Sequence, residues 1–144
     1  GRRIIEDAFA ARRPGQYQLQ AAIAGCHAAA PTASATDWAR ISRLYGLLAD
    51  LTSSPVVELN RAVAVAMADG PAAGLALVAR LEAGGALAGY YLLAATRADL
   101  LRRLGRNEEA AVAYEEAAAL AGTGPERRFL NARLAEVRSA NSGF

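Results

Sequence analysis

Apolar residues recur at intervals of three and four along nearly the whole chain, and proline, glycine and small polar residues separate the apolar segments. Residues at that spacing lie on one face of a helix, whereas a half-buried strand would show strict alternation. The pattern therefore predicts helices throughout and no strand. The expected helices cover about residues 4–12, 19–26, 38–51, 55–69, 71–83, 90–104, 107–121 and 123–137.

Residues that begin and end helices lie near these boundaries. Ser54 precedes Pro55, and a serine cap followed by a proline in the first turn is typical of a helix start. Two arginines come before Gly105, which indicates a helix C-terminus by both charge and backbone freedom. The run 123–126 has the spacing of a capping box. These signals favour an all-α fold of about eight helices joined by short turns.

Composition favours a single helical domain over residues 1–144. All 16 positions counted as Lys or Arg are arginine. With 53% hydrophobic and 21% charged residues, the chain is unlike a disordered one. Its net charge of +2 is too small to indicate a nucleic-acid binder. Because no run of 18 consecutive apolar residues occurs, we expect no membrane span and a soluble domain.

An internal repeat relates the fourth and fifth expected helices to the sixth and seventh. Each matched residue has its counterpart 36 positions later. The matched pairs are Ala62 with Ala98, Gly74 with Ala110, Val78 with Tyr114, and Leu81 with Ala117. Small residues in the first two pairs let neighbouring helices approach closely, and a larger residue four positions later fills the space to the next pair of helices.

The repeat resembles the tetratricopeptide (TPR) repeat, whose second helix carries an alanine and, four residues later, an aromatic residue, as Ala110 and Tyr114 do. The copy at 55–84 is looser, and residues 16–52 form a third pair. The resemblance implies a right-handed stack of antiparallel helix pairs, about eight helices in all, whose first helices line a concave groove. The candidate residues for binding a protein segment in this groove are Gln18, Gln20, Asn60, Arg61, Arg97 and Asp99.

For Asn60 and Arg61 a second interpretation stays open, in which this polar pair satisfies nearby loop carbonyls. The groove interpretation depends on their position just before the small residue Ala62, on the first helix of a repeat.

No residues have the pattern of an active site, a metal site or a cofactor site. Cys26 and His27 are the chain's one cysteine and one histidine, whereas a metal site needs three or four ligands. Adjacent side chains on a helix diverge by about 100°, so these two cannot act as nucleophile and base. We expect Cys26 to be buried and structural, and His27 to lie at the helix edge. Phosphate-binding glycine motifs are absent from the sequence as well, so it predicts no enzyme activity and no cofactor.

Several separated segments follow one known order. They are residues 14–24, 36–38, 57–64 (VELNRAVA), 70–75, 97–106 (RADLLRRLGR), 126–130 and 133–134. Together they resemble the C-terminal extension of a group of bacterial extracytoplasmic-function (ECF) RNA polymerase sigma factors, which carry a TPR-like domain after their DNA-binding regions. The resemblance covers about residues 3–138. The family's promoter-reading regions precede this segment and are absent from residues 1–144.

The resemblance implies a cytoplasmic parent protein that directs RNA polymerase to promoters, while residues 1–144 carry regulation or assembly in place of a separate anti-sigma factor. The implied partners are the sigma factor's own DNA-binding regions, the RNA polymerase core and a DGPF (YCII-like) family protein. Promoter DNA would be contacted only through the parent's other regions.

Two alternatives to this interpretation are a free-standing TPR-like peptide-binding adaptor and an enzyme. No residues support an enzyme. Against the adaptor, the chain starts without methionine, and residues 2–7 already read as the interior of a helix. An upstream reading frame that encodes a helix-turn-helix and core-binding helices would distinguish the sigma factor from the adaptor.

Overall fold

A computed structural model describes residues 15–122 and 124–141 of the chain. These residues form seven α-helices and one short 3-10 helix, and none of them lies in a strand. The elements are α2 (Gly15–Ala29), η1 (Ala33–Ala35), α3 (Trp38–Thr52), α4 (Pro55–Asp69), α5 (Pro71–Gly84), α6 (Tyr91–Arg103), α7 (Asn107–Leu120) and α8 (Gly124–Asn141). The all-α prediction is confirmed for this part of the chain. The helix expected at 4–12 lies outside the described residues.

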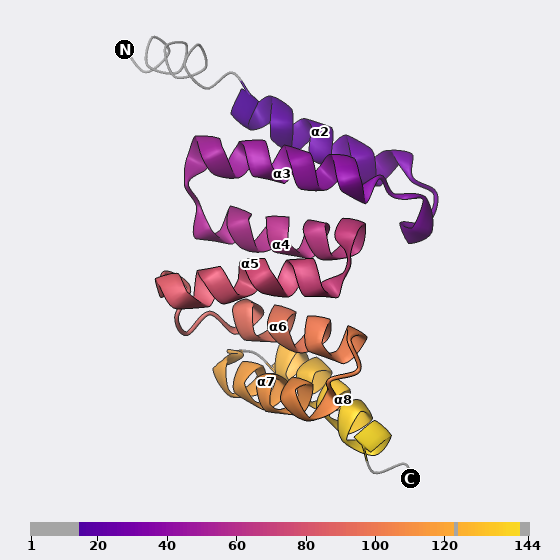
Figure 1. Cartoon of the computed structure of the whole chain (residues 1–144), viewed down its shortest axis with the longest axis vertical. Coiled ribbons are helices and arrows are strands. Elements are labelled where there is room, and N and C mark those ends of the chain that lie inside the picture. Colours follow the sequence, from indigo (N-terminus) through magenta and orange to yellow (C-terminus); the bar gives the residue numbers. More distant parts are fainter. Residues whose placement is uncertain (1–14, 123, 142–144) are drawn as a thin grey trace.

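The helices follow one another in an elongated stack, with α2 at one end and α7 and α8 at the other (Figure 1). Neighbours in sequence are neighbours in space, and the most extensive contacts join α6 to α7, α3 to α4, α7 to α8 and α4 to α5. Short turns reverse the chain between successive helices, so that α5 runs back along α4 and α7 runs back along α6 (Figure 1). In the described part, no helix combines the length and the apolar character that a membrane crossing requires.

The 36-residue repeat is present in the structure as well as in the sequence. Helix α6 begins 36 residues after α4, and α7 begins 36 residues after α5. The repeated small residues Ala62 and Ala98 are both fully buried, and so is Ala110. The contact between paired helices is therefore built on matching residues in the two copies.

Gly74 shows how closely the helices of a pair approach each other. A Cβ atom added there would lie 2.6 Å from the Cβ of Ala66 and 2.9 Å from the carbonyl oxygen of Ala62, both on α4. Real Cβ atoms essentially never come that close to their neighbours. The α4/α5 contact therefore requires glycine at this position, whereas the α6/α7 contact accommodates Ala110.

Buried residues form three clusters along the stack. The first surrounds Ile41 between α2, α3 and α4, the second surrounds Val78 between α4, α5 and α6, and the third surrounds Tyr114 between α6, α7 and α8. All three side chains are at most 2% exposed. Since each helix contacts mainly its neighbours, the interior is divided along the stack, as in repeat proteins.

Helix ends are capped largely as the sequence predicts. The Ser54 hydroxyl accepts a hydrogen bond from the backbone N–H of Val57 at 3.3 Å, and Pro55 occupies the first turn of α4. Gly105, with φ of 77°, follows the C-terminus of α6. The capping box expected at 123–126 includes Thr123, which lies outside the described residues.

Replacing Gly74 by alanine should destabilise the protein by about 1–3 kcal/mol, because the added methyl group forces α4 and α5 apart. Thermal and urea unfolding followed by circular dichroism measure this. The control is Gly25→Ala on α2, where nothing lies within 4 Å of the added atom. There we expect a gain of about 0.5–1 kcal/mol, since alanine favours the helix. Equal effects of the two substitutions would contradict the close α4/α5 contact.

Candidate functional site

Arg97 on α6 joins three helices through its guanidinium group. It donates one hydrogen bond to Glu82 on α5 and another to Glu116 on α7, the second at 2.6 Å. Its side chain is 25% exposed. Arg97 also lines a hollow of about 480 Å³ between α5, α6 and α7. Two carboxylates from different helices thus neutralise this arginine within the protein.

Arg61 on α4 lines a different hollow, of about 520 Å³, between α3 and α4. Its nearest carboxylate is Glu58, one turn earlier on the same helix, with 3.6 Å between Nη1 and Oε2. On α3 the chain has Gly46 beside the guanidinium group, and a Cβ added there would lie 3.6 Å from Nε of Arg61. Among the described residues, no carboxylate of α3 therefore forms an ion pair with Arg61, although Asp50 of α3 lines the same hollow.

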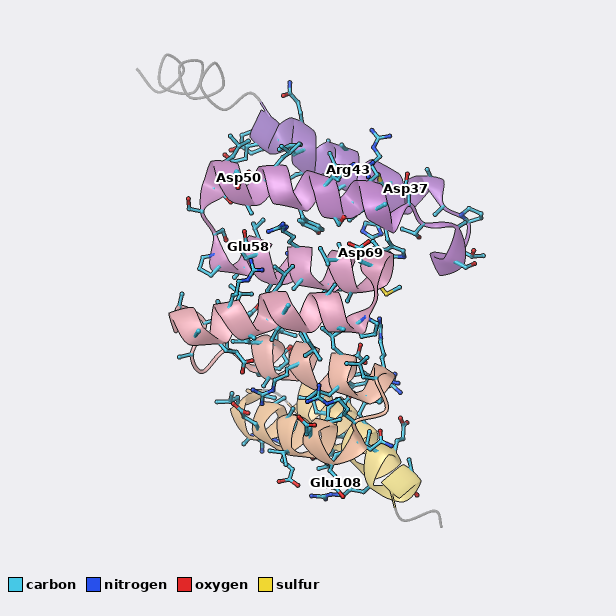
Figure 2. The ribbon with its side chains drawn as sticks, viewed as in Figure 1. Asp37, Arg43, Asp50, Glu58, Asp69 and Glu108 are labelled. Atoms are coloured by element: carbon cyan, nitrogen blue, oxygen red, sulfur yellow. The ribbon has the colours of Figure 1, made fainter. Side chains whose placement is uncertain are left out.

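Both signs of charge surround the Arg61 hollow. Arg43 and Asp50 come from α3 and Asp69 comes from the end of α4 (Figure 2). None of these three forms an ion pair with another residue that the structure describes. Apolar side chains complete the lining, and one of them, Leu47, is 54% exposed. Such a surface offers charge, hydrogen bonding and apolar contact together.

The other candidates lie elsewhere on the stack. Gln18 and Gln20 are exposed on α2, and Asn60 is exposed on α4. Asp99 accepts a hydrogen bond from Arg102 and forms an ion pair with Arg103, and both arginines lie on its own helix. Arg61 and Arg97 line separate hollows. A single groove that includes all six candidates stays a prediction.

A second polar network connects α6 to the buried core. Nε of Arg102 donates a hydrogen bond to the hydroxyl of Tyr114 at 3.2 Å, and the same arginine binds Asp99. Burial raises the pKa of Tyr114 above the ordinary tyrosine range, although the hydrogen bond from Arg102 opposes the shift. The hydrogen bond to Asp99, followed by that to Tyr114, raises the pKa of Arg102. The network therefore favours the charged form of Arg102, whereas burial is what favours the protonated form of Tyr114.

Cys26 is only half-buried, so the expectation of a buried cysteine is wrong. It packs on the Ile41 cluster from one side and lines a hollow of about 440 Å³ from the other. His27 is exposed, as expected for the helix edge, and meets the Trp38 ring edge-on with 5.4 Å between ring centres. Among the described residues, no three Cys, His, Asp or Glu side chains gather as metal ligands.

An apolar cleft between α6 and α8 was not anticipated from the sequence. Its volume is about 320 Å³, and Tyr91, Leu92 and Phe129 line it. Phe129 is 59% exposed and has the guanidinium carbon of Arg133 5.4 Å from its ring centre. Leu130 is buried in the cluster around Tyr114, whereas the preceding residue, Phe129, is exposed. In the sequence, the aromatic residue Phe129 was the one signal that this helix has a second apolar surface.

Comparisons with known proteins relate nearly the whole chain to part of a longer bacterial protein. No family model matches the chain, and no solved structure matches it. An uncharacterized protein of Rhizobium meliloti (strain 1021) is 47% identical over 131 residues, which are 91% of this chain. The match spans about 30% of that relative's length. The relative is therefore a much longer protein, which contains a segment similar to almost all of this chain.

Arg97→Gln should lower the free energy of unfolding by about 1 kcal/mol, because Glu82 and Glu116 lose their shared partner. High salt should reduce the effect, since salt screens partly exposed charges. Urea unfolding at low and high salt measures both. The control is Arg106→Gln, whose pair with Glu109 is about half exposed. It should change stability by no more than about 0.5 kcal/mol, and an equal loss in the two variants would contradict the joining role of Arg97.

Alkaline pH should destabilise the protein through Tyr114. The pKa of Tyr114 is higher in the folded than in the unfolded state, so the protonated side chain contributes to stability. This contribution is fully present below about pH 10 and is lost as pH rises through the folded-state pKa. In Tyr114→Phe the alkaline loss should be smaller, while stability at pH 7 falls by about 0.5–1.5 kcal/mol with the lost hydrogen bond. Urea unfolding between pH 7 and 11 measures both effects. If the free energy of unfolding fell equally steeply with alkaline pH in wild type and in Tyr114→Phe, the loss would not come from Tyr114.

Proposed function

We propose that this chain is the TPR-like regulatory domain of an ECF sigma factor and that it acts by protein–protein contact. In this proposal the parent protein directs RNA polymerase to promoters. Residues 1–144 bind the parent's own DNA-binding regions, the polymerase core or a DGPF (YCII-like) protein in the cytoplasm. They hold no cofactor and catalyse no reaction.

The observation that carries the proposal is the helix-pair repeat. Two successive pairs begin 36 residues apart and meet through matching small residues, with Ala62 and Ala98 fully buried. Repeat stacks of this kind present long surfaces, because each pair adds area without closing a central core. A TPR-like stack therefore suits binding of an extended or helical segment better than it suits catalysis in an enclosed pocket.

Two further observations support the sigma-factor part of the proposal. Separated segments such as 57–64 and 97–106 occur in the order typical of ECF sigma-factor extensions. The Rhizobium meliloti relative has most of its length outside the matched segment, as expected of a protein in which this domain accompanies other regions.

Direct promoter reading is not part of the proposal. Specific recognition needs side chains aimed at base edges, supported by phosphate contacts on the same face. The chain has 14 acidic residues against 16 arginines, and arginines of α6 and α8 such as Arg97, Arg102 and Arg133 are engaged with carboxylates. Only weak, salt-sensitive DNA association is expected from such a surface.

We expect residues 1–144 to bind the parent's promoter-binding regions in trans, and deletion of these residues to impair or deregulate transcription by the parent. Co-purification of the two separately tagged parts measures the first effect, and a promoter reporter with the truncated parent measures the second. Fluorescence anisotropy on promoter and scrambled DNA is the control, with equal, weak binding expected. Sequence-dependent DNA binding by residues 1–144, or normal regulation without them, would contradict the proposal.

A further inference from the structure

Arg61 and Arg97 are equivalent residues of the two repeats. Each is the seventh residue of its helix, because α4 begins at Pro55 and α6 begins at Tyr91. Each lines a hollow beside the preceding helix of the stack, which is α3 for Arg61 and α5 for Arg97. Their surroundings can therefore be compared position by position.

The two arginines differ in the carboxylates around them. Arg97 is bound by Glu116 on the following helix, and the residue 36 positions before Glu116 is Arg80. Arg97 is also bound by Glu82 on the preceding helix, whereas Gly46 lies beside Arg61 on its preceding helix. The first repeat thus lacks both carboxylates that bind Arg97 from neighbouring helices. Arg80 stands at the position of Glu116, and Gly46 stands at the position of Glu82.

What remains for Arg61 is a weak pair within its own helix. The 3.6 Å between its Nη1 and Oε2 of Glu58 exceeds hydrogen-bonding length, and both side chains are more than a third exposed. Arg43 adds a second guanidinium to the same hollow and forms no ion pair with any described residue. The hollow therefore holds two arginines with unused hydrogen-bond donors.

We propose that the hollow between α3 and α4 binds an acidic side chain of a partner polypeptide, whose carboxylate takes the place beside Arg61 that Glu82 and Glu116 take beside Arg97. This inference rests on the proposed protein-interaction function and names the chemistry of the bound segment. The bonds are charge-assisted and bidentate in the manner usual for guanidinium and carboxylate.

A peptide fits this hollow better than a free anion. Exposed Leu47 and the neighbouring Val65 give apolar contact beside the arginines, which a small anion cannot use. The carboxylates of Asp50 and Asp69 are hydrogen-bond acceptors in the same hollow and would bind backbone N–H groups or a basic side chain of the same segment. The expected segment therefore has one glutamate or aspartate next to an apolar residue, with a basic residue nearby.

Selection of peptides from a phage-displayed library of random sequences tests the inference. The bait is the 144-residue chain, as wild type, as Arg61→Gln, and as the control Arg106→Gln, whose arginine lies outside this hollow. Wild type and control should select peptides that share an acidic position, and Arg61→Gln should not. The synthetic consensus peptide should bind Arg61→Gln at least tenfold more weakly in fluorescence anisotropy, and changing its acidic residue to the amide should cause a similar loss.

Gly46→Glu supplies a carboxylate from within the chain and gives a second test. The Cβ position at 3.6 Å from Nε of Arg61 is an ordinary contact, and Gly46 lines the hollow of about 520 Å³ into which the rest of the side chain can extend. Gly46→Glu should melt at a higher temperature than the matched Gly46→Gln, by a margin that shrinks in high salt. It should also bind the consensus peptide at least tenfold more weakly than Gly46→Gln does.

The inference fails if no acidic position is selected, if Arg61→Gln selects the same peptides, or if both Gly46 variants bind equally. These outcomes are separate from failure of the proposed function. If the parent's promoter-binding regions do not bind the chain but acidic peptides are selected through Arg61, the sigma-factor proposal fails and this inference stands. If those regions bind wild type and Arg61→Gln equally and no acidic peptide is selected, the sigma-factor proposal stands and this inference fails.

Discussion

The close contact between the two helices of a pair is the constraint on which the rest of the structure depends. At Gly74 the backbones of α4 and α5 are so near that even a methyl group would meet Ala66 and the carbonyl of Ala62. Small residues bury little apolar area each, so an alanine-rich stack gains its stability from many short contacts repeated along its length. This explains why the interior consists of three clusters in succession instead of one large core.

Polar networks supplement this apolar contact where the helices are less closely joined. The α5/α6 junction has fewer contacts than the pairs on either side, and Arg97 connects α5 to α7 there through two carboxylates. Arg102 similarly links the end of α6 to Tyr114 in the core of the last cluster. Arginine suits such positions because its planar group presents five donors in fixed directions.

The same repeat also creates a difference between its copies. Equivalent arginines at 61 and 97 keep their position on the helix, but the two positions that hold the carboxylates paired with Arg97 hold Gly46 and Arg80 in the other copy. In a stack, such substitutions leave packing intact, because charged side chains lie at the surface between helices and not in the buried clusters. Binding properties can therefore change in one repeat without loss of the fold, which is how repeat proteins diversify their surfaces.

The sequence by itself determined the helical class, most helix boundaries and the register of the two repeats. Apolar spacing, the Ser54 cap and the 36-residue shift are local or periodic signals, and each depends only on residues a few positions apart or on direct self-comparison. The composition of the buried contact was equally visible, since Ala62, Ala98 and Ala110 are small residues at matching positions.

Only the tertiary structure decided which side chains meet across helices. The partners of Arg97 lie 15 and 19 residues away, and nothing in their sequence separation marks them as partners. Cys26 is half-buried because α2 ends the described stack and packs mainly on α3. Phe129 is exposed because Leu130, and not its neighbour, turns toward α7. Helix spacing tells which residues share a face, but the rotation and separation of packed helices decide what each face contacts.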